Sequence, residues 1–323
     1  MGTKRFTGAG LPIPALVALL IICIFTSTQS TQFLTLENFK AIADQAAITL
    51  IIACGLTFVI LMGSIDLSIQ GVIAASAMST SLLIANDRTD FNMGFGVFGI
   101  GIGIGALIGL LAGLAVTVIR IPSFIVTIAT WNFGLGIGYI LFGSGSQPGI
   151  QDKKFIGLGI DTFFGLTKIV WIAVGIAALS FIIQRYTIFG RYAYVIGGSE
   201  ETALLSGINV KRFRVLAFIF SGATSGLAGT LLASKMGIGA VNSGEGLLFL
   251  TISSVVIGGT LLNGGRGGIL HSIIGVLIMT TIYIAMILLG VSSFFQNIVQ
   301  GLVVLIVVVI ASWKQRKPLR TVL

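Results

Sequence analysis

The sequence predicts an all-α, polytopic integral membrane protein with about ten transmembrane helices and both termini in the cytoplasm. Composition gives the first indication: 55% of the 323 residues are hydrophobic and 9% are charged, whereas soluble domains carry about 25% charged residues. Residues 267–313 contain no Lys, Arg, Asp or Glu, which leaves room for two crossing helices of about 20 residues each. Because the apolar runs are continuous, they indicate helices and not the alternating strands of a membrane barrel.

The charge-free runs place the individual helices. The first run follows Lys4 and Arg5 and is longer than the about 7–15 apolar residues of a signal peptide, so we expect an uncleaved first span. The last two spans are separated by a turn at 289–293. No polar block is long enough for a soluble domain, so residues 1–323 are expected to form one transmembrane domain. The expected spans are 11–28, 45–63, 67–85, 94–119, 122–142, 169–184, 215–233, 247–262, 269–289 and 292–313.

The charged residues between these spans orient the chain. Thirteen of the 19 Lys and Arg residues lie on the side of the termini, and seven of the ten acids lie on the opposite side. An excess of Lys and Arg marks the cytoplasmic face of a membrane protein, so both termini are expected there. Membrane orientation accounts for the net charge of +9, and no nucleic-acid partner is predicted.

Glycine is abundant, with 44 residues. In the fourth expected span, glycines recur every four residues and therefore share one helix face. Small residues at this spacing favour close packing of helices in lipid; the alternative is that the stripe lines a path or permits sliding. No Gly-x-x-x-x-Gly-Lys-Ser/Thr motif occurs, so the chain is not expected to bind ATP through a P-loop. The stripe consists of Gly101, Gly105, Gly109 and Gly113.

The longest cytoplasmic loop, about 185–214, contains the signals of a short helix. Ser199 is a good N-cap, and Glu200 and Glu201 fall in the first turn, where the helix dipole favours acids. Gly207 is a natural stop. A helix of about two turns is unstable alone, so we expect it either to rest on neighbouring spans or to dock onto a cytoplasmic partner protein.

Four segments carry a resemblance to a known family. The loop holds Gly190-Arg191, residues 197–201 (Gly-Gly-Ser-Glu-Glu) and residues 205–210 (Leu-Ser-Gly-Ile-Asn-Val) in an order that resembles the coupling loop of ribose-type permeases of bacterial ATP-binding-cassette importers. Gly63-Ser64-Ile65-Asp66-Leu67-Ser68 is similar to a second signature of that family, in which Gly is commoner than Ser64. The two further matches are residues 255–260 followed by 264–267, and residues 289–296.

The resemblance implies a ten-helix permease of the bacterial cytoplasmic (inner) membrane that translocates a sugar or similar small polar solute inward. It implies a second permease copy or a paralogue, two cytoplasmic ATPases that carry ATP-Mg, and an extracytoplasmic solute-binding protein. The chain itself is then a transport component that binds no cofactor and is not an enzyme. The residues expected to contact the ATPase are Arg191, Gly198, Ser199, Glu200, Glu201, Ala203, Leu205, Ser206 and Gly207.

Polar and aromatic residues within the spans are candidates for the translocation path, because polar side chains in lipid face other helices or water. Asp66 has apolar runs on both sides, and its structural alternative is to cap the start of the third span. For the neutral residues the alternative is hydrogen bonding between helices. The path candidates are Asp66, Ser68, Trp131, Asn132, Asn263, Phe295 and Gln296.

A second hypothesis is a self-sufficient, ion-coupled secondary transporter that uses Asp66 as a proton or sodium site. Catalysis is not expected, because the chain has one histidine and no Ser-His-Asp set or close carboxylate pair. For that histidine, His271, we expect a local backbone partner. Residues 247–267 resemble residues 54–71 in outline, each with an apolar stretch followed by Gly-Ser or Gly-Thr and a polar residue, which suggests an internal repeat.

Overall fold

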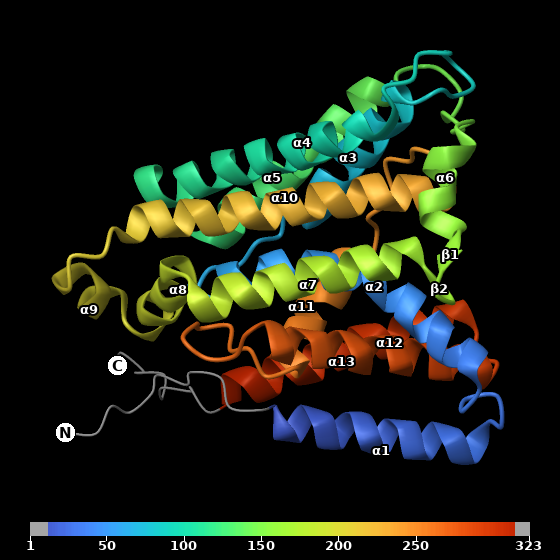
Figure 1. The fold of residues 1–323 in the computed structure, drawn as a ribbon. Helices are drawn as coiled ribbons and strands as arrows, with labels where there is room; N and C mark the ends of the chain where they lie inside the picture. The colour runs from blue at the N-terminus through green and yellow to red at the C-terminus, as the bar shows by residue number, and fades with distance from the viewer. Residues whose placement is uncertain (1–11, 314–323) are drawn as a thin grey trace, which may run out of the picture.

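The computed structural model describes residues 12–313. Most helices run along one common direction, with α8 and α9 at one end and α6 and the β1–β2 hairpin at the other (Figure 1). The elements are α1 Ile13–Gln29, α2 Leu36–Leu61, α3 Ile69–Leu83, η1 Gly94–Gly96, α4 Val97–Leu114, η2 Ala115–Ile119, α5 Ser123–Phe142, α6 Lys153–Ile160, β1 Thr162–Phe163, β2 Leu166–Thr167, α7 Lys168–Tyr186, α8 Ile188–Gly198, α9 Glu200–Leu205, α10 Val210–Met236, α11 Leu247–Ile257, α12 Ile269–Leu288 and α13 Ser293–Trp313.

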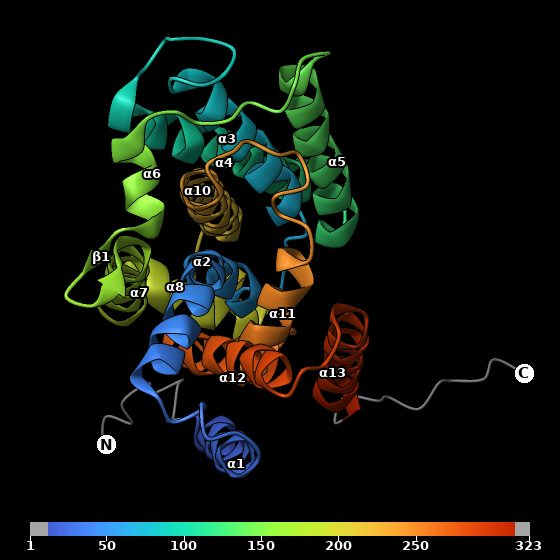
Figure 2. The same cartoon turned by 90° about the vertical axis from the view of Figure 1, so that its right-hand side faces the viewer.

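Helices α2 and α10 form the centre of the bundle (Figure 2). Along α2, Ile51, Ile52 and Leu56 are fully buried, and the helix packs on α7, α10, α11 and α12. The outer helices α4, α5 and α7 instead expose long apolar side chains, for example Ile140 on α5 at 81%. Apolar residues on both the inside and the outside are expected of helices that are surrounded by lipid.

The glycine stripe of α4 packs directly on α10. A Cβ on Gly105 would overlap the carbonyl oxygen of Gly222, and a Cβ on Gly222 would overlap that of Gly105. Gly109 lies in the same way against the carbonyl of Phe218, and Gly101 against the hydroxyl of Thr230. The prediction that the stripe serves close packing is confirmed.

Six helical segments of the described residues are long and apolar enough to cross a membrane: 36–61, 94–119, 123–142, 168–186, 210–236 and 269–288. Helices α1, α3 and α11 are apolar but shorter, so the expected number of ten spans stays a prediction. The helix in the expected span at 247–262 is shorter than expected, because α11 ends at Ile257 and Gly258-Gly259 follow. Its 11 residues rise about 16 Å, roughly half the apolar thickness of a bilayer.

Three features were not expected from the sequence, and the first is helix α6, between the expected spans 122–142 and 169–184. Helix α8 precedes α9, and a two-stranded antiparallel hairpin interrupts the otherwise helical chain before α7. Phe164 and Gly165 form its turn with φ values of 49° and 81°, and the Trp171 indole N–H donates to the Phe163 carbonyl at 2.8 Å. The prediction of an all-α chain is therefore correct for the bundle and wrong for this short connection.

Candidate functional site

Helix α9 forms as predicted, at one end of the bundle (Figure 1). The Ser199 hydroxyl accepts a hydrogen bond from the Thr202 amide at 3.2 Å, as an N-cap does. The helix ends at Gly207 with φ 76°, where the Ile208 amide bonds the Ala203 carbonyl at 3.1 Å and the Gly207 amide bonds the Leu204 carbonyl at 3.0 Å. This is the Schellman pattern, which only a residue tolerant of positive φ completes without strain.

One side of α9 is fastened to the bundle and the other projects from it. Ala203 is buried, and the guanidinium of Arg214 on α10 donates to both carboxylate oxygens of Glu200, at 2.8 and 3.3 Å. These bonds lower the pKa of the Glu200 carboxyl. On the projecting side, Leu204 is 57% and Leu205 is 85% exposed. The other predicted contact residues that lie exposed are Arg191, Gly198, Ser199, Glu201, Ser206 and Gly207.

Helix α8 connects this projecting helix to the interior of the bundle. The last turn of α8 crosses the end of α2 and the segment between α11 and α12, with glycines at the crossing. A Cβ on Gly197 would overlap both the Leu61 carbonyl oxygen and the Gly265 amide. The Gly265 amide itself donates to the Leu61 carbonyl at 2.9 Å. The three segments therefore meet through backbone atoms.

The two interior segments at this crossing end their preceding helices in the same way. After α2, the Gly63 amide bonds the Ile60 carbonyl and the Ser64 amide bonds the Val59 carbonyl, at 2.9 and 3.1 Å. After α11, Gly259 and Thr260 bond Val256 and Val255 in the same pattern, at 2.9 and 3.2 Å. Both glycines have positive φ. The structure thus gives a local geometric counterpart to the weak repeat seen in the sequence.

Asp66 lies in the first of these segments and is 1% exposed. One carboxylate oxygen accepts from the Ser68 amide at 2.9 Å and from the Ser68 hydroxyl at 2.6 Å. The other oxygen accepts from the Ser221 hydroxyl of α10 at 2.7 Å. Asp66 therefore satisfies the free amide of Ser68, the residue before α3, and ties the start of α3 to α10, in agreement with the structural alternative. Ser68 is buried in the same network.

The other path candidates lie in separate places. Asn132 is exposed at the middle of α5, and its amide donates only to its own helix, to the Ile128 carbonyl at 3.0 Å. Next to it, the Trp131 backbone packs against Gly71 of α3. Asn263 is exposed in the segment after α11. Its backbone carbonyl lies against Gly63, close to the Asp66 segment.

On α13, Phe295 is 62% exposed, whereas Gln296 is buried and donates to the Val291 carbonyl at 2.8 Å. Gln296 therefore stabilises the turn before its own helix. His271 on α12 is also buried, and its Nδ1 atom has no hydrogen-bond partner among the described residues. The expected backbone partner for that nitrogen is absent from the described part of the chain, so this expectation was wrong.

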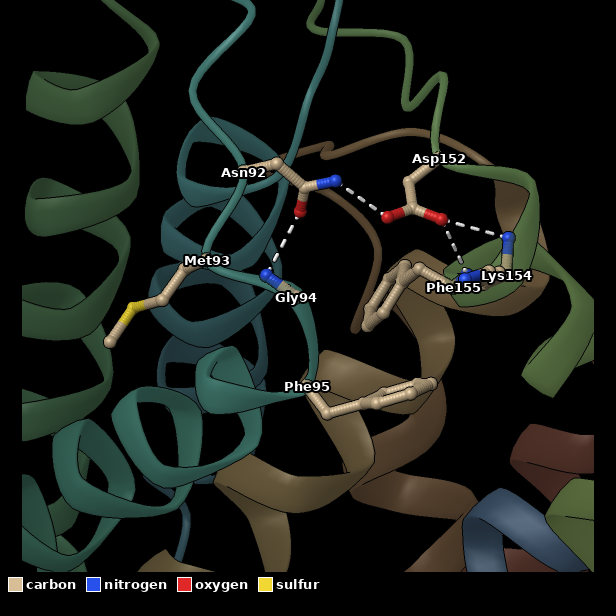
Figure 3. Close-up of a pocket in the computed structure, with 7 residues that line it drawn as sticks. All are labelled: Asn92, Met93, Gly94, Phe95, Asp152, Lys154 and Phe155. Carbon is tan, nitrogen blue, oxygen red and sulfur yellow. Dashed lines mark hydrogen bonds between the residues drawn. The ribbon is translucent and has the colours of Figure 1, made fainter.

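A pocket of about 340 Å³ lies at the opposite end of the bundle, between the start of α4 and α6. Figure 3 shows the Asn92 amide between Gly94 and Asp152, above the rings of Phe95 and Phe155. Donation from Asn92 at 2.6 Å lowers the pKa of the Asp152 carboxyl, which also caps α6. The polar groups of Asn92 and Asp152 thus bond within the protein, and no predicted site residue lines this pocket.

Sequence reasoning missed two buried hydrogen-bonding residues, Gln184 on α7 and Tyr194 on α8. The Gln184 side chain, at the end of α7, donates to the Tyr194 hydroxyl and accepts from the Ile269 amide at 2.7 Å. The Tyr194 hydroxyl donates to the Gly267 carbonyl at 2.7 Å, and burial raises the pKa of Tyr194. The available signal in the sequence was the position of Gln184, a polar residue at the end of an apolar run.

The comparisons with known proteins agree on one class. The family described as branched-chain amino acid transport system / permease component matches residues 38–308. The L-arabinose transport system permease protein AraH of Escherichia coli K12 is 35% identical over 93% of this chain and 90% of its own length. The ribose import permease protein RbsC is 32% identical in E. coli K12, over 97% and 98%, and 33% in Haemophilus influenzae, over 94% of each. No solved structure matches.

These matches support the importer-permease hypothesis and give no support to the ion-coupled alternative. They extend over the bundle, the α8–α9 segment and both glycine-bounded segments, so they concern the whole architecture and not one motif. The chain belongs to the family of branched-chain amino acid transport system permease components.

Proposed function

We propose that this chain is the membrane-spanning permease of an ATP-binding-cassette importer, and that it moves a sugar or a similar small polar solute inward. The observation that carries the proposal is α9, which is pinned by Glu200 to Arg214 while it presents Leu204 and Leu205 at the end of the bundle. An exposed apolar tip on a fixed base suits a protein partner. The names of the arabinose and ribose permeases favour a pentose or a related sugar.

We propose the following topology. Ten helices cross the bacterial cytoplasmic (inner) membrane, with both termini and α8–α9 in the cytoplasm. In support, the described start of α1 and end of α13 lie at the same end of the bundle as α9 (Figure 1). Arg191, Lys211 and Arg212 also lie at that end, in agreement with the rule that Lys and Arg gather on the cytoplasmic side. The terminal charges that were counted for this orientation, at 4, 5, 314, 316, 317 and 320, lie outside the described residues.

We propose that α9 docks onto a cytoplasmic ATPase that binds ATP-Mg, and that two such ATPases serve two permease chains, identical or paralogous. An extracytoplasmic solute-binding protein would deliver the solute at the α6 end. The chain would then need no cofactor of its own and would act through conformational change and not as an enzyme. A partner that binds one conformation better shifts the permease toward that conformation.

Among the path candidates, Asn132 is the one that the structure favours. An amide at the middle of an exposed helix is disfavoured against lipid, so we infer that it faces water, solute or a partner chain. We also propose three further residues for the translocation path: Trp131, Asn263 and Phe295. Asp66, Ser68 and Gln296 have structural hydrogen bonds, and we assign them to support of the helix ends.

The test is a docking experiment with Leu205→Asp, which places a charge on the most exposed apolar residue of α9. We expect the variant to fold normally but to lose co-purification of the ATPase and ATP-driven uptake. Leu34→Asp is the matched control, because Leu34 is 66% exposed in the α1–α2 connection. ATPase bound equally well by Leu205→Asp and by the unmodified chain would contradict the docking role of α9.

A further inference from the structure

The first turn of α12 is capped by side chains from outside its own helix. Its N-cap is Gly268, which has no side chain to offer. The Ile269 amide donates to the Gln184 side chain of α7 at 2.7 Å, and the Gly268 amide donates to the Thr260 hydroxyl at 3.2 Å. Free amides at a buried helix start need such partners. The start of α12 therefore depends on where α7 places Gln184.

Tyr194 of α8 holds this capping side chain in place. Its hydroxyl accepts from the Gln184 amide and donates to the Gly267 carbonyl at 2.7 Å. One hydroxyl thus joins α7, α8 and the segment before α12. Gln184 is 8% exposed, so water has little access to replace either partner. A shift of α8 would break both bonds together.

Backbone contact connects the same three parts. Gly197 and Gly198 at the end of α8 lie against Gly264 and Gly265; a Cβ on Gly265 would lie 2.9 Å from the Gly198 amide. Helix α9 begins two residues after this contact, because α8 ends at Gly198 and α9 starts at Glu200. A displacement of α9 is therefore transmitted to residues 258–268 by direct backbone contact, with no flexible side chain in between.

We propose that Tyr194 and Gln184 form the link through which the α8–α9 segment repositions residues 258–268 and the start of α12. The inference rests on the proposed function, in which an ATPase binds α9. Tyr194 is a positioning residue, because its hydroxyl acts through the Gln184 side chain and the Gly267 carbonyl. Its loss uncouples the interior from the docked ATPase while docking itself persists.

Tyr194→Phe tests the link, because it removes one hydroxyl and keeps the ring. The permease is purified with its ATPase in lipid nanodiscs, and hydrogen exchange of residues 258–272 is measured without nucleotide and with ATP plus vanadate. We expect a nucleotide-dependent difference in the unmodified chain and its loss in Tyr194→Phe. The control is Tyr192→Phe, on the same helix, whose ring packs on Phe213 with centroids 4.8 Å apart; it should keep the difference.

Gln184→Leu removes the same bridge from the α7 side and should lose the nucleotide-dependent difference as well. A purely structural role would lower protection in both nucleotide states and leave the difference intact, which would overturn the proposal. An unmodified chain that shows no difference would overturn it too. Failure of the ATPase to co-purify with the unmodified chain would instead refute the proposed function, so the two failures are distinguishable.

Discussion

The two glycine-bounded segments, residues 62–68 and 258–268, share a helix ending but differ in how the next helix begins. After α2, the Ser68 amide just before α3 is bonded from within the segment itself, by Asp66, whose second oxygen bonds Ser221 on the central helix α10. After α11, the Ile269 amide of α12 is capped by Gln184 from α7. The first segment is thus fixed to the core, whereas the second is fixed to helices that continue into the projecting α8–α9 segment.

This difference shows that similar local sequences acquire different roles from their capping partners. A segment that is hydrogen-bonded to a central helix is expected to stay in place during a conformational change. A segment whose cap is held by a peripheral helix is expected to follow that helix.

Asp66→Ala should produce the largest loss of stability. It leaves the buried Ser68 amide and the Ser221 hydroxyl without an acceptor, and we expect a cost of about 3–5 kcal/mol. Thermal unfolding in detergent measures it. Asp66→Asn keeps an acceptor and should cost about 1 kcal/mol. ATP-driven uptake should survive in Asp66→Asn; its complete loss in a stably folded protein would revive the ion-coupled hypothesis.

Gly264→Ala and Gly63→Ala form a matched pair. Both positions have positive φ, 85° at Gly264 and 72° at Gly63, so each alanine costs about 1 kcal/mol in backbone strain. At Gly264 the new Cβ would also lie 2.7 Å from the Leu61 carbonyl oxygen, whereas at Gly63 the nearest atom is 3.3 Å away. We expect Gly264→Ala to be the more destabilising by about 1–3 kcal/mol. Equal melting temperatures would show that the crossing of α8 is looser than described.

Gln184→Leu should cost about 2 kcal/mol, because the Ile269 amide loses its acceptor inside the protein. Thr260→Val, which removes the acceptor of the neighbouring Gly268 amide, should cost about 1–2 kcal/mol. Denaturation of the two single variants and the double variant measures their coupling. Strict additivity would mean that the two caps act independently and that α12 does not begin as one unit.

The smallest expected effect concerns the ion pair between Glu200 of α9 and Arg214 of α10. Because the bond from Arg214 lowers the pKa of Glu200 in the folded chain, the ion pair stabilises α9 above the ordinary pKa of 4.5. This contribution is lost as the pH falls through the lower, folded-state pKa. Half of the Glu200 side chain is exposed, so the contribution should stay below about 1 kcal/mol.

Hydrogen exchange of residues 199–209 against pH, corrected for intrinsic rates, measures this effect. Glu200→Gln should remove the acid-dependent loosening, and the exposed neighbouring variant Glu201→Gln should retain it. Loosening that is identical in Glu200→Gln and in the unmodified chain would assign the effect to another group.

The sequence predicted the apolar helices and α9 because their signals are local. Uninterrupted apolar runs and the Ser199–Gly207 cap pair depend on neighbouring residues only. Helix α8 was missed because its mixed polar and aromatic residues, which follow Arg185 at the end of an apolar run, form no long apolar pattern. The hairpin was missed because Phe164-Gly165 lacks the Asn-Gly or Asp-Gly signal of such turns.

The buried network was less predictable, because its partners are distant along the chain. Gln184 and Ile269 are 85 residues apart, and nothing near either residue in the sequence indicates the other. Asp66 could be assigned as a local cap through Ser68, but its bond to Ser221 spans 155 residues. Periodicity likewise could not show that α11 ends at Ile257, since the apolar run continues past Gly258 to Leu262.

The glycine contact between α4 and α10 restricts where the bundle can rearrange. With backbone lying on backbone at Gly105 and Gly222, neither helix can slide or roll by a fraction of a turn without steric collision. Helices α4 and α10 therefore move together as one rigid body. Any opening or closing of the bundle must then come from movement of helices outside this pair, above all α11, α12 and α13.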